Sequence, residues 1–225
     1  MKTIGILQPS YIPWIGYFDQ INKCDVFVLY DDVQYDKNGW RNRNKIKTAN
    51  GPVWLTIPVL TKGKPDQKLC DIKIDNKYNW REKHIKTIKM AYAKAPFAED
   101  YIPEFEQILQ EDWELLIDVN LAVLNLLLAW LNINTPIHLS SRQHIEGEKS
   151  EKILRFCEKF GATNYLSGDK ARDYLDTELF ASKNITVNWH SYQHPTYPQR
   201  YGEFLGYLSV LDLIFNVGKK SKEIF

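Results

Sequence analysis

Apolar residues form short, nearly continuous runs at several places in the chain, and two of these runs lie near its start. Residues 3–7 and 25–30 are almost wholly apolar, and residues 14–22 between them can form a helix. Strands that are apolar throughout are typical of parallel sheets covered on both faces. The first thirty residues therefore predict a strand, a helix and a second strand parallel to the first.

The pattern changes over residues 40–59, where charged and apolar residues alternate on both sides of a Gly51-Pro52 turn. Alternation on either side of a turn predicts an antiparallel ribbon. We interpret residues 31–78, which contain this ribbon, as an insertion in a single α/β domain spanning residues 1–225.

The rest of the chain predicts further helices and strands. Apolar residues recur at helical spacing, or form long apolar helical regions, over residues 79–94, 104–131 and 150–160. Three more short apolar runs predict strands at residues 136–140, 164–166 and 185–189. Ser209 and Gly218 bracket one more short helix. Together these elements predict a three-layer, Rossmann-like (HUP-like) α/β fold around a mostly parallel sheet of about five strands.

Composition narrows the class of protein. The 225 residues include 29 Lys and Arg and 28 Asp and Glu, so no global field draws the chain to nucleic acid or an anionic membrane, and any basic site must be local. The most apolar stretch, residues 115–131, is interrupted by polar residues and is shorter than the ~20 residues of a membrane span. Three widely separated cysteines and the absence of a signal-peptide pattern predict reduced thiols and a cytoplasmic location.

Polar residues follow the predicted strands, and ligands of open parallel sheets bind beyond the strands' carboxyl ends. One of Asp31 and Asp32 could be a base or a metal ligand, because only one of two neighbours on a strand faces a given pocket. The backbone of Ser167 and Gly168 could hold an anion, and Asp169 could orient a hydroxyl or amine. Both segments can also be read as plain turns. Gln8 ends the first strand and could fix a ligand through its amide.

The first connection, LQPSYIPWIGYFDQ, is rich in rings and prolines. Gly16 could admit a phosphate or carboxylate to the helix start. Tyr11 and Trp14 could offer a ligand a flat face. The alternative is that these residues only start and pack the helix. Tyr35 and Tyr197 are further rings that could contact a substrate.

Two stretches carry basic or titratable side chains. In NGWRNRNKIK, the cations Arg41, Arg43 and Lys45 are spaced by two, which on a strand places them on one face suited to a diphosphate. A solvated edge strand protected by charge is the alternative. In WHSYQHPTYPQ, His190 and His194 lack a third metal ligand nearby, so a histidine general base, which we assign to His194, is the better interpretation.

Four blocks identify a family: LQPSYIPWIGYFDQI, DVFVLYDDVQYDKNGWRNRNKIK, YLSGDKARDYL and LSVLDLIFNVG. In this order they resemble the WbqC-like proteins over nearly the whole chain. The resemblance implies a role in surface polysaccharide and O-antigen synthesis, often beside enzymes that make amino sugars. The predicted order of strands, loops and helices is also similar to that of the nucleotide-binding HUP folds, including pantothenate synthetase. Their His-x-Gly-His motif is replaced here by the segment from Trp14 to Tyr17, which has no histidine.

These observations predict an enzyme that joins an amino acid or acyl group to an amino sugar, linked to a nucleotide, through an amide bond. Alternatives are a non-catalytic sugar-binding or partner-binding subunit and a nucleotidyltransferase. ATP is a candidate cofactor and a homodimer a candidate assembly; no metal site, nucleic-acid partner or membrane span is expected. The predicted catalytic residues are Asp31, Asp32, Asp169 and His194. The predicted substrate-binding residues are Gln8, Tyr11, Trp14, Gly16, Tyr35, Arg41, Arg43, Ser167, Gly168 and Tyr197.

Overall fold

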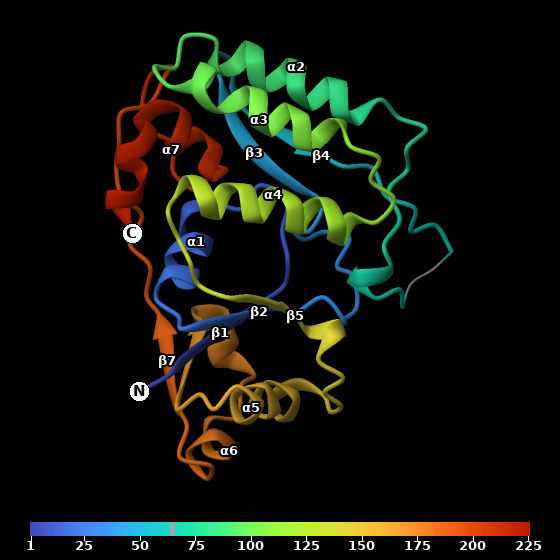
Figure 1. Ribbon diagram of the computed structural model, residues 1–225, viewed down its shortest axis with the longest axis vertical. Helices are drawn as coiled ribbons and strands as arrows, with labels where there is room; N and C mark the ends of the chain where they lie inside the picture. The colour runs from blue at the N-terminus through green and yellow to red at the C-terminus, as the bar shows by residue number, and fades with distance from the viewer. Residues whose placement is uncertain (64–65) are drawn as a thin grey trace. The chain divides into compact units, whose positions relative to one another are not determined.

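A computed structural model describes residues 1–63 and 66–225, and the chain divides into two compact units (Figure 1). The first, here called the α/β unit, consists of Met1–Gln8, Asp19–Asp32 and Asn134–Gln193. The second, here called the helical unit, consists of Pro9–Phe18, Val33–Ile133 and His194–Phe225. A single domain with an insertion over residues 31–78 stays a prediction, and residues 64–65 of that range lie outside the described residues.

The α/β unit is built on a five-stranded sheet with the order β5-β2-β1-β6-β7. Its strands are β1 (Thr3–Leu7), β2 (Val26–Leu29), β5 (Ile137–Leu139), β6 (Asn164–Gly168) and β7 (Thr186–His190). Every neighbouring pair in the sheet is parallel. The predicted Rossmann-like α/β fold is therefore confirmed, and the near-continuous apolar runs identified its central strands because those strands are buried on both faces.

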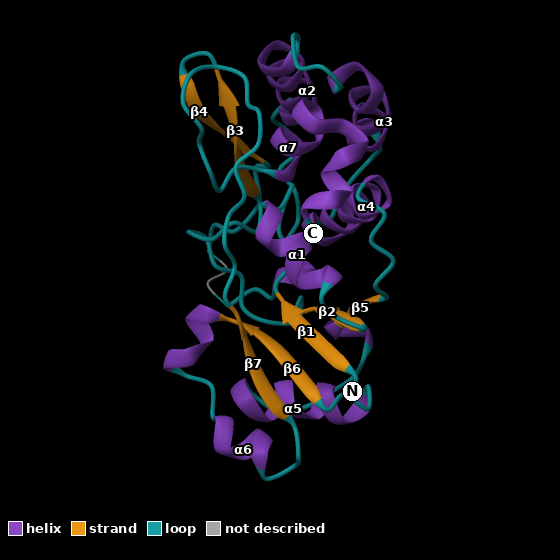
Figure 2. Ribbon diagram, turned by 90° about the vertical axis from the view of Figure 1, so that its left-hand side faces the viewer, coloured by secondary structure: helices purple, strands orange, loops and turns teal. Residues whose placement is uncertain are grey.

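Helices cover both faces of this sheet (Figure 2). On one face, α5 (Lys149–Lys159) and α6 (Thr177–Ala181) pack against the strands through a core that includes Ile4, Phe156 and Phe180. On the other face lie residues 19–22, the end of α1 (Ile15–Asn22). Two short 3-10 helices follow strands in this unit: η2 (Ser140–Arg142) follows β5, and η3 (Asp169–Asp173) follows β6.

The helical unit combines a ribbon with four longer helices. The ribbon pairs β3 (Arg43–Thr48) with β4 (Gly51–Thr56) in antiparallel register, as the alternation predicts. The helices are α2 (Trp80–Tyr92), α3 (Ala98–Gln110), α4 (Leu116–Trp130) and α7 (Val210–Val217), and the 3-10 helices are η1 (Leu69–Asp71) and η4 (Gly218–Ile224). The predicted bounds of α7 are confirmed, because the Ser209 hydroxyl accepts a hydrogen bond from the Leu211 N–H at 3.3 Å and Gly218 has a φ of +64°.

The helical region predicted over residues 104–131 contains two helices, α3 and α4. Residues between them are extended, since the Glu114 carbonyl accepts from the Ile74 N–H and the Leu116 N–H donates to the Ile72 carbonyl, both at 2.8 Å. These bonds occupy backbone groups that a continuous helix would use. Within the described ranges, no helix has both the length and the apolar run needed to cross a bilayer.

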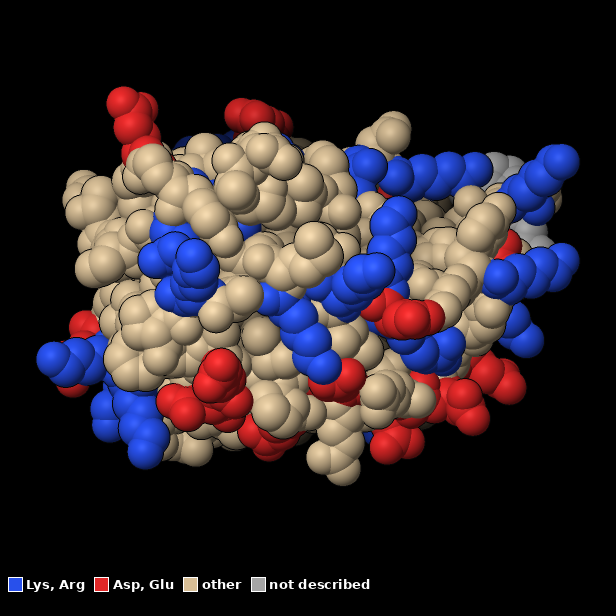
Figure 3. Space-filling view, turned by 90° about the horizontal axis from the view of Figure 1, so that it is seen from above, with Lys and Arg blue, Asp and Glu red and all other residues tan. Residues whose placement is uncertain are grey.

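Charges of both signs lie on the outer face of the helical unit. Seen from above, lysine and arginine side chains share the surface with acidic side chains (Figure 3). One contact joins the two signs across helices, with Lys89 of α2 lying 2.5 Å from Glu106 of α3. This mixture agrees with the overall net charge of +1 and argues against a broad surface of one sign.

Candidate functional site

The strand order of the sheet reverses between β1 and β6, and this point locates the candidate site. From β1 the chain adds β2 and β5 on one side, then returns to add β6 and β7 on the other. Ligands of open parallel sheets bind at the carboxyl ends of the strands beside such a reversal. Gln8 directly follows β1, and Ser167 and Gly168 end β6, so these three predicted residues lie at the strand ends that flank the reversal.

Asp31 joins the ends of two strands. Its side chain is 1% exposed, and its carboxylate accepts hydrogen bonds from the Ser141 N–H at 2.8 Å and the Ser141 hydroxyl at 2.7 Å. The Ser140 hydroxyl lies 2.9 Å from the same carboxylate and accepts from the Asp31 N–H at 3.0 Å. This carboxylate therefore stabilises the turn after β5.

Asp32 forms a largely buried ion pair that the sequence does not predict. One of its oxygens lies 2.5 Å from Lys152 Nζ, and the other lies 2.5 Å from the Ser140 hydroxyl. The Lys152 ammonium also lies 5.4 Å from the centre of the Tyr30 ring. Both Asp31 and Asp32 thus reach Ser140, because they lie beyond the end of β2, where the alternation of a strand no longer applies.

A second pair, between His190 and Asp19, lies at the end of β7. His190 Nε2 is 2.5 Å from Asp19 Oδ2, and the two side chains are 6% and 8% exposed. Asp19 Oδ2 also accepts from Lys23 Nζ at 2.6 Å. Burial alone would raise the pKa of Asp19, but the hydrogen bonds from His190 and Lys23 outweigh it and lower that pKa. Asp19 is therefore a carboxylate at neutral pH.

This geometry fixes the tautomer of the His190 ring. A carboxylate can only accept, so the proton between the two groups belongs to Nε2, and in the neutral ring Nδ1 carries the lone pair. Nδ1 makes no hydrogen bond within the described part of the chain and is not one of its fully buried, unpartnered atoms. The pair therefore holds an oriented imidazole whose neutral form has its lone pair on Nδ1.

Open space lies beside this histidine. Gly168 is the register partner of His190 across β6 and β7, and a Cβ added at Gly168 would meet nothing within 4 Å. Ser167 is 1% exposed, and its hydroxyl donates to the Tyr165 hydroxyl at 3.3 Å. Asp169 lies outside this space in an exposed ion pair with Arg172 at 3.2 Å. Of the predicted residues on β6, Gly168 is the one that borders both His190 and open space.

The other predicted residues belong to the helical unit, and several are engaged in its packing. The Tyr11 hydroxyl is buried and lies 3.0 Å from His84 Nδ1. The Trp14 ring covers Gly16 so closely that a Cβ there would lie 2.2 Å from it. Gly16 is thus needed to accommodate Trp14, and the space that the sequence suggested for a ligand holds the indole ring.

Arg41 does not share a face with Arg43. It precedes β3, and its guanidinium donates to the Ser10 hydroxyl at 3.0 Å. Burial lowers the pKa of Arg41, while the nearby Tyr17, Asp36 and Tyr35 side chains favour its charged form. Arg41 is therefore a desolvated cation among polar groups, of the kind that binds anions.

Asn120 was not predicted and lies next to Arg41. Its amide NH2 donates to the Arg41 carbonyl at 2.9 Å, while its side-chain oxygen is buried with no hydrogen-bond partner in the described part of the chain. Nothing in a sequence distinguishes this asparagine from others on the apolar helix α4.

Arg43 keeps the predicted outward position on the ribbon together with Lys45. Both lie against the Trp54 ring, at 4.9 Å and 4.8 Å from its centre. The alternation is confirmed on the opposite face, where Asn44 is 1% exposed and its amide donates to the Ile12 carbonyl.

His194 and Tyr197 hold the segment that precedes α7. The ring of His194 donates from Nδ1 to the Pro195 carbonyl at 2.8 Å and accepts at Nε2 from the Tyr207 N–H at 3.0 Å. The Tyr197 hydroxyl donates to Asp212 at 3.0 Å and is buried. Both nitrogens of His194 are therefore occupied by backbone groups, which leaves His190 as the better placed base.

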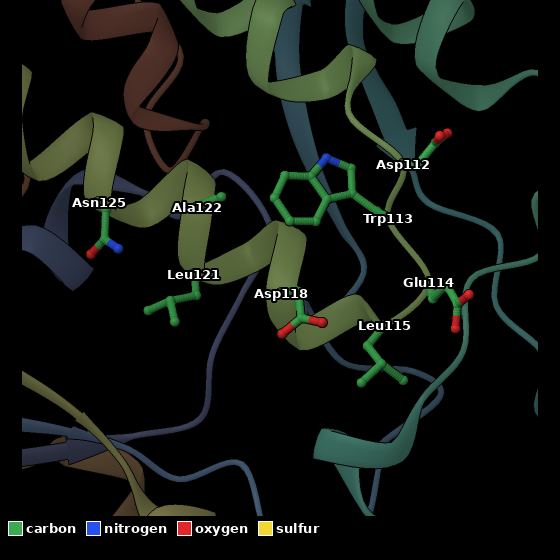
Figure 4. Close-up of a pocket in the computed structure, with 8 residues that line it drawn as sticks. All are labelled: Asp112, Trp113, Glu114, Leu115, Asp118, Leu121, Ala122 and Asn125. Carbon is green, nitrogen blue, oxygen red and sulfur yellow. The ribbon is translucent and has the colours of Figure 1, made fainter.

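A hollow of about 650 Å³ lies at the start of α4 in the helical unit (Figure 4). Its lining includes three acidic residues, Asp112, Glu114 and Asp118, and none of the predicted site residues. Among the described residues there is no group of three or more His, Cys, Asp and Glu side chains placed to hold a metal ion.

Known proteins similar to this chain define a family. The sequence profile of the WbqC-like protein family matches residues 8–224. An uncharacterized protein of Mycobacterium tuberculosis, Rv1507c, is 39% identical over 227 residues, which cover 99% of this chain and 97% of that protein. No solved structure matches the chain.

Proposed function

Because the chain belongs to the WbqC-like protein family, we propose that it is an enzyme of surface polysaccharide or O-antigen synthesis. Its substrate is an amino sugar carried on a nucleotide, and its reaction joins an amino acid or acyl group to the sugar amine. The family resemblance suggests the pathway. The Asp19–His190 pair at the carboxyl edge of the sheet is the observation that carries the chemistry.

The reaction requires a base, because an amine that attacks an acyl carbon must lose a proton. The nitrogen lone pair forms the C–N bond to an activated donor, R–CO–X, as the C–X bond breaks and X leaves with its electron pair. His190 Nδ1 takes the proton from the amine and returns it to X, so the products are the amide and HX. A positioned base of this kind contributes about 10²–10⁴-fold to a rate.

Asp19 supports this role in two ways. Its carboxylate accepts a hydrogen bond from Nε2–H, with Nε2 and Oδ2 2.5 Å apart, which holds the neutral ring in the tautomer with the lone pair on Nδ1. It also stabilises the imidazolium that forms when His190 accepts a second proton. The lowered pKa of Asp19 keeps this group charged while the reaction proceeds.

The open space at Gly168 is where the amine would lie. Gly168 neighbours His190 across the two strands and has no side chain, so a substrate can approach the backbone there. Gln8, at the end of β1, would hold a hydroxyl or carbonyl of the sugar. The Asp32–Lys152 pair provides a further charged group at the same edge of the sheet.

The test is direct detection of product. The protein is incubated with nucleotide-linked amino sugars, amino acids and ATP, or with acyl thioesters, and mass spectrometry identifies any amide. His190→Gln and Asp19→Asn should each slow the reaction at least about 100-fold. His144→Asn is the matched control, because His144 is an exposed histidine of the same unit with a φ of +51° that asparagine tolerates.

Two outcomes contradict the proposal. If no combination yields an amide, the chain is not an amide-forming enzyme for this substrate class. If an amide forms but the His190 and Asp19 variants keep the wild-type rate, His190 is not the base; if the sugar nucleotide binds and no amide forms, the chain acts as a binding subunit of the pathway.

A further inference from the structure

Two exposed tryptophans lie side by side at the ribbon: Trp54 in β4, and Trp40 three residues before β3 begins. Trp40 is 40% exposed and Trp54 is 44% exposed, and their ring centres lie 5.0 Å apart at an angle of 51°. Large apolar rings that share one exposed site are uncommon away from binding surfaces. We call Trp40, Arg43, Lys45 and Trp54 together the ribbon face.

Two cations accompany these rings. Lys45 Nζ lies 4.8 Å from the centre of the Trp54 ring and 5.9 Å from that of Trp40, and the Arg43 guanidinium lies 4.9 Å from Trp54. Within residues 1–63 and 66–225, neither cation forms an ion pair with a carboxylate. The ribbon face therefore combines flat rings with two cations that have no carboxylate partner in the described part of the chain.

The local structure holds this face in place. Lys45 is the register partner of Trp54, and the Lys45 carbonyl accepts from the Ser209 N–H at 2.8 Å. The Arg43 guanidinium donates to the Asn38 carbonyl at 2.8 Å, which orients its fork. On the other side of the ribbon Ile46 and Leu55 are buried. This burial fixes which face of the two strands points to solvent.

We propose that the ribbon face binds a nucleoside diphosphate group. The base stacks on an indole, and the two phosphates take Arg43 and Lys45, which release part of their contact with the rings. This inference goes beyond the proposed function and stands on the rings and cations of the ribbon face. It adds Trp40 and Trp54 as binding residues and separates the role of Arg43 and Lys45 from that of Arg41, which donates to Ser10.

The chemistry favours a single nucleotide over other occupants. A neutral sugar would use the rings but would leave two cations without partners, and inorganic polyanions would use the cations but not the rings. Single-stranded nucleic acid repeats the same chemistry, but it needs a continuing basic track. The net charge of +1 provides no excess of basic residues for such a track, and acidic side chains lie among the basic ones on the face seen in Figure 3.

Binding is tested on the full chain by calorimetry with tryptophan fluorescence as a second signal. The probes are UDP, dTDP and GDP, together with uridine and inorganic pyrophosphate. At least one nucleoside diphosphate should bind, and uridine and pyrophosphate should each bind at least about ten-fold more weakly. If none of the three diphosphates binds, the inference is wrong.

Variants locate the site. Trp54→Ala and Lys45→Gln should each weaken binding of the diphosphate at least about ten-fold, while Lys86→Gln, an exposed lysine on α2, should leave it unchanged. All four residues of the ribbon face lie at or near the surface, so circular dichroism should show that the variants fold. Unchanged affinity in both folded variants would place the nucleotide elsewhere.

The remaining outcomes separate this inference from the proposed function. Tighter binding of an eight-residue oligouridylate than of UDP, by more than about ten-fold, would overturn the choice of a single nucleotide. Nucleotide binding that depends on Trp54 and Lys45, without any amide product, would overturn the reaction and leave the ribbon face supported.

Discussion

His84 of α2 should make the stability of the protein depend on pH in a way that one substitution removes. Its ring is 2% exposed, with Nδ1 accepting from the Tyr11 hydroxyl at 3.0 Å and Nε2 donating to the Thr56 carbonyl at 3.2 Å. Burial lowers the pKa of His84 to about 4, partly opposed by the Thr56 hydrogen bond. The ordinary value for an unfolded chain is about 6.5.

The sign and size of the effect follow from these two pKa values. Below about pH 6.5 the unfolded state binds a proton at His84 that the folded state does not bind until about pH 4. The free energy of unfolding must therefore fall as the pH is lowered through this range. Between pH 7 and pH 5 the loss from this one group is about 2 kcal/mol.

The assay is urea unfolding of the wild-type protein and of His84→Gln at pH 7 and pH 5. Other titrating groups contribute equally to both proteins, so the wild type should lose about 2 kcal/mol more than the variant over this range. Equal losses, within about 0.5 kcal/mol, would refute the reasoning. If the variant does not fold, NMR titration of the wild type gives the same test, because the His84 ring should remain neutral at pH 5.

Three further predictions concern the sheet edge and the first connection. Asp31→Ala should lower the free energy of unfolding by about 2–4 kcal/mol, because it leaves the Ser141 N–H and hydroxyl without their acceptor. Asp169→Ala should lower it by at most about 1 kcal/mol, and equal urea midpoints for the two variants would contradict this prediction. Gly16→Ala should displace the Trp14 ring and cost about 1–3 kcal/mol, visible as a change in near-UV circular dichroism, and an unaltered spectrum would show that the ring does not cover Gly16. Gly168→Val should unfold at nearly the same urea concentration as the wild type but should lose amide formation, because the valine side chain would enter the open space beside His190. Full activity of this variant would place the substrate elsewhere.

The fold could be predicted well where local pattern and tertiary structure agree. The first strand is correct to the residue, because Thr3 to Leu7 is an apolar run that the sheet buries. The predicted end of α7 is also correct, because Gly218 has a positive φ, and a glycine in that conformation commonly ends a helix. The break between α3 and α4 was not predicted, since it depends on backbone bonds to residues 72–74, about forty positions earlier in the chain.

The candidate site was predicted less completely, because its main contact joins distant residues. Asp19 lies within a helix and is separated from His190 by 171 positions, so no local spacing indicates that they pair. Lys152 is similarly ordinary in sequence until the fold brings it to Asp32. Gly16 shows a different limit: a glycine that admits a ligand and one that accommodates a neighbouring ring look the same in a sequence.

The rate of amide formation by Asp19→Asn tests the central claim most directly. The substitution keeps the shape of the side chain but removes the carboxylate that orients His190, so Nδ1 is no longer held as the basic nitrogen. The account predicts a loss of at least about 100-fold in kcat with the substrate still bound, and a wild-type rate for His144→Asn. A wild-type rate for Asp19→Asn would contradict the assignment of His190 as the base.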